Sequence, residues 1–362
     1  MLRRPCSTRP PLHKLDESEV QRRTRNLAAL LELGFESAAA PDPEPTLTEI
    51  DPIGRNRVRV SQALPAMGTV VSVSVLDESA DRALERAAAA YAEMHRTIDL
   101  FNRYDDASAL GVLNSCARLR AAPPEFIEVL RRAQFTQAAS NGAFDMTVAP
   151  VIDVFRDHRE RGLAGPPDSG LIDAARARVN ATGVAIHGHD VRLRDGVSVT
   201  LDGIAKGYIV DRMAAAVDEA EGFLINAGGD VRTGGTRDGD LPWQVGVRNP
   251  ESPDAELDVL PLFAGAVATS GSYEIYFDRE RTQHHIVNAF GVSPGDCLAV
   301  TVRAPSATFA DSLATAAFVA GPGAGLRTIE SVPGCSGLIV DATGRQHTTK
   351  NWRPGAGTPN TP

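Results

Sequence analysis

The sequence is poor in cysteine, with four in 362 residues. Three of them, Cys116, Cys297 and Cys335, share no spacing typical of a metal site, so we expect reduced structural thiols. No apolar run approaches the roughly 18 residues that a membrane-spanning helix needs. The net charge is −9, and lysines and arginines are scattered along the chain. These features argue against a duplex nucleic-acid binder, a polybasic membrane binder and a protein inserted in a membrane.

The sequence also shows neither a recognisable targeting signal nor a common nucleotide-binding motif. Residues 1–11 contain charges but no apolar core after them, which does not fit a secretory signal, and Cys6 lacks the preceding apolar run of a lipoprotein anchor. We therefore expect a cytoplasmic protein. The chain has no G-x-G-x-x-G or G-K-[ST] pattern, so it predicts neither a Rossmann site nor a P-loop.

Composition divides the chain into three parts. Residues 1–60 read as an N-terminal arm, with one amphipathic helix near residues 26–34 and a stiff proline-rich linker at residues 40–45. Residues 61–345 form the predicted core domain. Residues 346–362 are expected to be a flexible C-terminal tail.

Periodicity within the core predicts strands and helices in alternating groups. Residues 69–76 alternate between apolar and polar side chains, as a half-buried strand does. Apolar residues at helical spacing predict helices over residues 81–101, 125–141 and 206–220. Short apolar runs predict strands over residues 197–201, 222–226, 243–248, 264–269 and 298–303. This order predicts an α+β fold in which mixed or antiparallel sheets are layered with helices.

The C-terminal run from Ala304 to Gly321 predicts a short apolar helix that ends at Gly321-Pro322. On such a helix Asp311 and Thr315 lie four residues apart and project from one face. A carboxylate and a hydroxyl together offer oxygen ligands to a hard divalent cation and leave room for phosphate oxygens, which suits Mg²⁺. From spacing alone, the commoner arrangement is a solvated aspartate and a threonine packed by its methyl group.

Glycine-bearing segments and a histidine pair are the other candidates for chemistry. Four segments at the ends of predicted elements could bring backbone N–H groups close to a phosphate, although each also fits a simple turn. His284 and His285 precede an extended run, where adjacent side chains point to opposite faces, so at most one serves a given site. Histidine is the natural proton acceptor for a hydroxyl nucleophile at neutral pH.

In chain order, eight segments between residues 64 and 342 match one pattern. They are Met67-Gly68-Thr69; Tyr104 with Ser108 and Asn114; Gly142 to Asp145 with Pro150; Gly203 to Tyr208 with Asp211; Gly228 to Asp230; Ala268 to Tyr273; His285-Ile286; and Ala310-Asp311 with Thr315. This collinear set resembles the ApbE family, the FAD:protein FMN transferases. The resemblance implies an ApbE-like (T-fold-like) core and an enzyme.

The resemblance also implies a reaction and its residues. Family members cleave FAD at its pyrophosphate, release AMP and join FMN by a phosphoester bond to a Thr or Ser of a target protein, with Mg²⁺. In this sequence His285 matches the residue that takes the proton of the target hydroxyl. The matching metal ligands are Asp311, Thr315 and a backbone carbonyl placed at Gly203. The matching FAD contacts are Met67, Tyr104, Ala143, Phe144, Asp145, Lys206 and Ile286.

Two departures from the family pattern stand near these residues. The segment before Lys206 reads Thr200-Leu201-Asp202-Gly203, so the usual carboxylate has moved by two positions, and Asp202 is expected to substitute for it on the same face. After His285, Asn288 and Ala289 replace an Asp-Pro pair.

Three functions remain open on these grounds. They are the FMN transferase, a Mg²⁺-dependent FAD pyrophosphatase that passes FMN to water, and a flavin-binding protein without catalysis. The expected partners are FAD and a target protein with a Thr/Ser flavinylation motif. We expect no nucleic acid and no membrane insertion, and the sequence is compatible with a monomer or a dimer.

Overall fold

The structure is a computed structural model that describes residues 47–54, 56–163, 165–252, 254–272 and 284–355. The helix and linker predicted within residues 1–46 lie outside the described residues. Among the helices that the structure describes, none combines the length and apolar character needed to cross a bilayer.

One large antiparallel sheet organises the described part of the chain. Every neighbouring pair of its strands is antiparallel. In spatial order the strands are β1 (Leu47–Ile53), β2 (Arg57–Ala66), β3 (Thr69–Asp77), β7 (Gly222–Ala227), β8 (Asp230–Gly235), β11 (Gly265–Gly271), β12 (Cys297–Ala304), β13 (Ser336–Asp341) and β14 (Gln346–Thr348).

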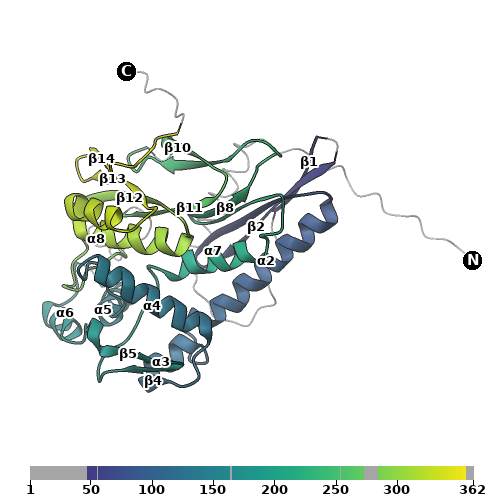
Figure 1. Ribbon diagram of the computed structural model, residues 1–362. Coiled ribbons are helices and arrows are strands. Elements are labelled where there is room, and N and C mark those ends of the chain that lie inside the picture. The colour runs from purple at the N-terminus through teal and green to yellow at the C-terminus, as the bar shows by residue number, and fades with distance from the viewer. Residues whose placement is uncertain (1–46, 55, 164, 253, 273–283, 356–362) are drawn as a thin grey trace, which may run out of the picture.

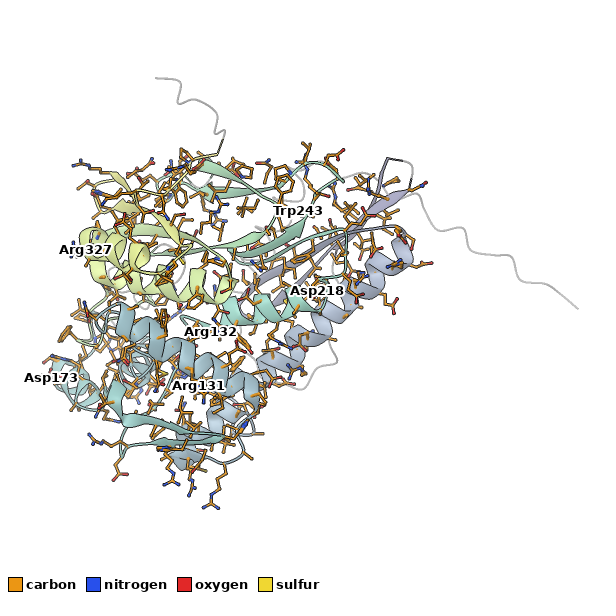
Figure 2. The ribbon with its side chains drawn as sticks, viewed as in Figure 1. Arg131, Arg132, Asp173, Asp218, Trp243 and Arg327 are labelled. Atoms are coloured by element: carbon orange, nitrogen blue, oxygen red, sulfur yellow. The ribbon has the colours of Figure 1, made fainter. Side chains whose placement is uncertain are left out.

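Three helices pack directly on one face of this sheet: α2 (Ala80–Phe101), α7 (Ala205–Ala215) and α8 (Ala307–Ser331). The other described helices are α3 (Ala109–Cys116), α4 (Pro124–Ala139), α5 (Ala149–Glu160) and α6 (Ser169–Arg176), with a 3₁₀ turn at Ala181–Gly183. Figure 1 shows α2, α7 and α8 side by side beneath the large sheet, with α4 against α8 on the side away from it. Charged side chains stand on the outer faces of these helices, among them the exposed Arg131, Asp173 and Arg327 (Figure 2).

The alternation predicted for the first core strand explains how the sheet meets the helices. Val71, Val73 and Val75 of β3 are fully buried, α2 packs on β3, and Ala87 and Met94 of α2 are fully buried as well. Burying a side chain of this size contributes about 1.5–3 kcal/mol. The strand therefore faces the main core with its valines.

The apolar run at residues 197–201 is not a strand, contrary to the prediction. It is extended and buried, but its backbone bonds to a side chain of α3 and to a loop. Asn114 pairs with Val199 through both amide atoms, donating to its carbonyl at 2.9 Å and accepting its N–H at 2.7 Å. The Thr200 N–H donates to the Met146 carbonyl at 2.8 Å. A buried backbone needs partners, and here a side chain supplies them in place of a neighbouring strand.

The C-terminal helix continues past its predicted end. Gly321 has φ = 77°, which breaks the helical path, and Pro322 begins a further helical stretch that ends at Ser331. A proline is tolerated in the first turn of a helix because that N–H has no intrahelical acceptor. Gly321-Pro322 is thus a kink in α8.

Two smaller sheets complete the fold. The hairpin β9 (Trp243–Arg248) and β10 (Glu256–Leu262) packs on the outer face of the large sheet around a second core. Trp243 at the start of β9, labelled in Figure 2, is buried and donates its indole N–H to the Gly234 carbonyl at 3.2 Å. The three-stranded sheet of β4 (Arg118–Leu119), β6 (Asp190–Leu193) and β5 (Val184–His187) lies at the opposite end of the molecule (Figure 1).

The predicted N-terminal arm and the predicted C-terminal tail both contribute strands to the large sheet. The boundary drawn at residue 60 falls within β2, and β1 pairs with β2 along its whole length. The flexible tail predicted from residue 346 is corrected by the structure, since β14 pairs with β13, Trp352 is buried in the second core and the Gly355 N–H donates to Asp258 at 2.9 Å. Only residues 356–362 of that tail lie outside the described residues.

Candidate functional site

A cleft lies where the C-terminal helix, the segment before α7 and two loops converge. Ten of the predicted site residues line it: Ala143, Phe144, Asp145, Asp202, Gly203, Lys206, His285, Ile286, Asp311 and Thr315. They come from segments as far apart in sequence as residues 143 and 315. The tertiary structure therefore gathers most of the predicted residues into one place.

Close packing of α7 on α8 builds one wall of the cleft. The Gly207 N–H donates to Asp311 Oδ2 at 2.9 Å, and a Cβ added at Gly207 would lie 2.3 Å from the Ala307 carbonyl oxygen. Only glycine allows this approach. The Asp211 carboxylate caps the start of α8 by accepting the N–H groups of Ala307 and Thr308, both at 2.8 Å. The start of α7 is thus held against the helix that carries Asp311.

The predicted metal ligands form an oxygen-rich corner of the cleft. Asp311 is 5% exposed, and Thr315 follows it by one turn of α8. A Cβ added at Gly203 would lie 3.2 Å from Thr315 Oγ1, so the backbone at Gly203 runs directly beside that hydroxyl. Ser270 Oγ is 3.4 Å from the same atom. A carboxylate, a hydroxyl and a nearby backbone carbonyl fit the ligand preference of Mg²⁺.

A different kind of metal site is not found in the described part of the chain. Among those residues, no group of three or more His, Cys, Asp or Glu side chains is placed to hold a metal ion. The donor set at Asp311, Thr315 and Gly203 therefore suits a hard cation that keeps several waters or phosphate oxygens, and not a structural zinc ion.

Lys206 is held in the cleft by a residue that the sequence reasoning did not assign to the site. Its Nζ lies 3.1 Å from Asp230 Oδ2, and Asp230 is 2% exposed. Burial raises the pKa of Asp230, and the ammonium of Lys206 opposes that rise. The sequence feature that could have identified Asp230 as a site residue is its position at the end of the glycine-bearing segment Gly228–Asp230. Thr269 and Ser270 also line the cleft and were likewise quoted only as part of a motif.

The loop between α4 and α5 is rigidly hydrogen-bonded. The Ser140 hydroxyl accepts the Phe144 N–H at 3.0 Å, and Asp145 Oδ1 accepts both the N–H of Thr147 at 2.8 Å and its hydroxyl at 2.7 Å. Gly142 has φ = 83°, which favours glycine at this turn. These hydrogen bonds hold the loop so that residues 143–145 line the cleft.

The two adjacent histidines have different surroundings. His284 is 5% exposed, its Nε2 lies 2.9 Å from the Pro294 carbonyl oxygen, and its ring meets Phe318 edge-on with centroids 5.3 Å apart. His285 lines the cleft and is partly exposed. The pair thus divides into a packed residue and a cleft residue.

Burial lowers the pKa of His284, which makes the fold sensitive to acid. Between that lowered pKa and the ordinary value of 6.5, the unfolded chain binds a proton at this site and the folded chain does not. The contribution is complete above about pH 6.5 and is lost as the pH falls toward the folded pKa, with a slope of at most about 1.4 kcal/mol per pH unit. Urea titrations at several pH values should show a smaller decline for His284→Gln than for the parent. Equal declines would contradict this reading.

Two predicted FAD contacts are not among the cleft-lining residues. Met67 has φ = 52° in the turn between β2 and β3, and its side chain packs against the main core. Tyr104 is 54% exposed, and the guanidinium groups of Arg103 and Arg156 lie 5.4 and 4.8 Å from its ring centroid. Arg103 approaches Asp202 at 3.9 Å, so Tyr104 stands beside the rim of the cleft.

Comparisons with known proteins agree with this architecture. The model of the ApbE family matches residues 67–339. An FAD:protein FMN transferase of Treponema pallidum is 30% identical over 324 residues, which cover 79% of this chain and 86% of that protein. The Salmonella typhimurium FAD:protein FMN transferase is 27% identical, with coverage of 70% and 77%.

Solved structures confirm the predicted α+β fold. The ApbE protein of Thermotoga maritima superposes with a TM-score of 0.73 at 28% identity, covering 81% of this chain and 97% of that one. The apo form of a Pseudomonas stutzeri flavinyl transferase superposes with a TM-score of 0.69 at 24% identity, covering 84% of this chain and 95% of that one. Their strands and helices share the arrangement described above.

Proposed function

This chain belongs to the ApbE family, and from that premise we propose that it is a Mg²⁺-dependent FAD:protein FMN transferase. In this reaction FAD is cleaved at its pyrophosphate, AMP is released, and FMN is attached by a phosphoester bond to a Thr or Ser of a target protein. The observation that carries the proposal is the cleft, which places the Asp311–Thr315 pair, the Lys206 ammonium and the His285 imidazole around one space.

The end of the cleft at Asp311, Thr315 and Lys206 would bind the phosphates of FAD. Asp311, Thr315 and the carbonyl of Gly203 would hold Mg²⁺, which when bound neutralises charge that develops on the phosphate oxygens. Lys206 adds a cation on the same space, and its ion pair with the buried Asp230 restricts where the ammonium can go. Phosphoryl transfer depends mainly on such positioning and charge stabilisation.

The loop at residues 143–145 and the main chain at Ile286 would bind FAD. Phe144 is 4% exposed and Ile286 is 7% exposed, so both offer apolar surface from within the cleft wall. Because the loop is already hydrogen-bonded, little ordering accompanies binding. Tyr104, at the rim, would contact a part of FAD that extends out of the cleft.

His285 would activate the acceptor. The hydroxyl oxygen of the target Thr or Ser attacks the phosphorus of the FMN half, and its proton passes to an imidazole nitrogen of His285. The bond between that phosphorus and the bridging oxygen breaks, and AMP leaves with the oxygen. A base is needed because a threonine hydroxyl is only weakly acidic at neutral pH.

Mass spectrometry of an acceptor tests the proposal. The chain is incubated with FAD, Mg²⁺ and Thr- or Ser-containing acceptor peptides, with an EDTA reaction as the control. We expect peptide-bound FMN and one AMP for each FMN attached, and neither product in EDTA. Free FMN with AMP and no modified peptide would indicate an FAD pyrophosphatase. Bound but intact FAD would indicate a flavin-binding protein without catalysis.

A further inference from the structure

Arg103 is a buried cation with an unused donor. It follows the C-cap residue of α2, its side chain is 7% exposed, and its Nη2 lies 2.6 Å from Asp153 Oδ1 on α5. Its Nη1 is buried and has no hydrogen-bond partner among the residues that the structure describes. A buried guanidinium N–H without an acceptor destabilises the fold, so such a group normally has a partner within reach.

The group that Nη1 faces is Asp202. Its Oδ2 lies 3.9 Å away, which is within ion-pair range and longer than a hydrogen bond. The Asp202 side chain is 58% exposed and lines the cleft. The following residue, Gly203, runs beside Thr315. Arg103 therefore reaches from the protein interior to the carboxylate that borders the proposed phosphate site.

Charge explains why these two residues belong together. A carboxylate at the mouth of a cleft that admits a pyrophosphate would repel the substrate, and a cation directly behind it offsets that repulsion. A carboxylate only accepts hydrogen bonds, so its partner on the substrate must be a donor and cannot be a phosphate oxygen. FAD carries such donors as hydroxyl groups of its sugar and ribityl parts and as N–H groups of its rings.

We propose that Arg103 is a positioning residue of the FAD site. Its guanidinium holds the Asp202 carboxylate at the rim of the cleft, and Asp202 accepts a hydrogen bond from a hydroxyl or ring N–H group of FAD. This inference rests on the proposed function. It also gives a physical reason why a carboxylate at position 202 can serve in place of one two residues earlier.

Equilibrium binding of FAD in EDTA tests the inference without turnover, by flavin fluorescence. We expect Arg103→Met and Asp202→Asn each to weaken FAD binding about tenfold, which is about 1.4 kcal/mol. The double variant should bind no more weakly than Asp202→Asn alone, because both changes remove one interaction. Arg156→Met is the matched control. It removes a second cation that also contacts Asp153 and Tyr104, and it should bind FAD like the parent.

Other results would overturn the inference. These are a double variant weakened about a hundredfold, an Arg103→Met protein that binds FAD like the parent, or an equal loss in Arg156→Met. A folded parent that binds no FAD would contradict the proposed function itself, and the inference with it. Thermal unfolding checks each variant. If Arg103→Met does not fold, Arg103→Gln keeps a hydrogen-bond donor for Asp153 without the charge and replaces it in the same cycle, with the same expectation.

Two fragments of FAD locate the donor. Binding of riboflavin and of AMP is measured for the parent and for Asp202→Asn by competition with FAD. A loss for riboflavin alone assigns the donor to the flavin half, and a loss for AMP alone assigns it to the adenosine half. Either result supports the inference, and a loss for neither fragment counts against it.

Discussion

Replacing Asp311 with alanine is expected to abolish Mg²⁺-dependent cleavage of FAD. The carboxylate is the one charged member of the proposed ligand set, and metal stabilisation of developing phosphate charge is worth several kcal/mol, so we expect AMP release to fall by about 10³-fold or more. Thr315→Ala should lower the rate less, because a neutral hydroxyl contributes less than a carboxylate to a hard cation. The measurement is AMP release over a Mg²⁺ titration.

The structure supplies the control for this experiment. Asp311 also accepts the Gly207 N–H at 2.9 Å, so Asp311→Ala removes a helix contact as well as a charge. Asp311→Asn keeps an acceptor oxygen of the same shape but loses the charge, so it should retain the parent's melting temperature and still lose most of the Mg²⁺-dependent rate. An Asp311→Ala protein that cleaves FAD at the parent's rate in EDTA would show that the metal site is misassigned.

Replacing His285 with alanine is expected to separate transfer from binding. General-base assistance is typically worth about 10² to 10⁴ in rate, so attachment of FMN to an acceptor should fall by about that factor. FAD and Mg²⁺ affinities should remain nearly those of the parent, because the imidazole is proposed to meet the target hydroxyl and not the metal. Flavinylation of an acceptor peptide and equilibrium FAD binding are measured on the same protein.

Replacing the neighbouring His284 with alanine shows whether a histidine here affects stability or transfer. From the sequence, a side chain that faces away from the site should tolerate replacement. The structure adds a cost in stability, since His284 is buried against Phe318 and hydrogen-bonded to the Pro294 carbonyl. We now expect His284→Ala to melt at a lower temperature while each folded molecule still transfers FMN. Equal loss of transfer in the two variants, or loss of FAD binding in His285→Ala, would mean that both histidines are structural.

Local periodicity determined much of the fold. The alternation in residues 69–76 predicts a strand, and β3 has its valines fully buried. The four-residue spacing of Asp311 and Thr315 predicts a shared helix face, and both residues line the cleft from α8. These predictions succeed because strand and helix geometry set the direction of nearby side chains whatever the rest of the chain does. The collinear motifs, in turn, were sufficient to indicate the family.

Tertiary packing decided the features that depend on distant segments. The extended run at residues 197–201 has the pattern of a strand, but its partners are Asn114 and Met146, so no ladder forms. Residues 346–355 are polar enough to predict a tail, yet β13 and the second core offer them a place to pair and pack.

Within the site, too, the sequence predicts single residues and tertiary packing decides their partners. The sequence predicts Lys206 and Asp202 as separate contacts, whereas their partners Asp230 and Arg103 emerge only from the structure. Each pair joins residues with no periodic relation, 24 and 99 positions apart in the numbering. Spacing along a helix or strand carries no information about such contacts. The buried carboxylate of Asp230 meets its cation, and the buried guanidinium of Arg103 its carboxylate, only when the segment after α2, the start of α7 and the large sheet pack together.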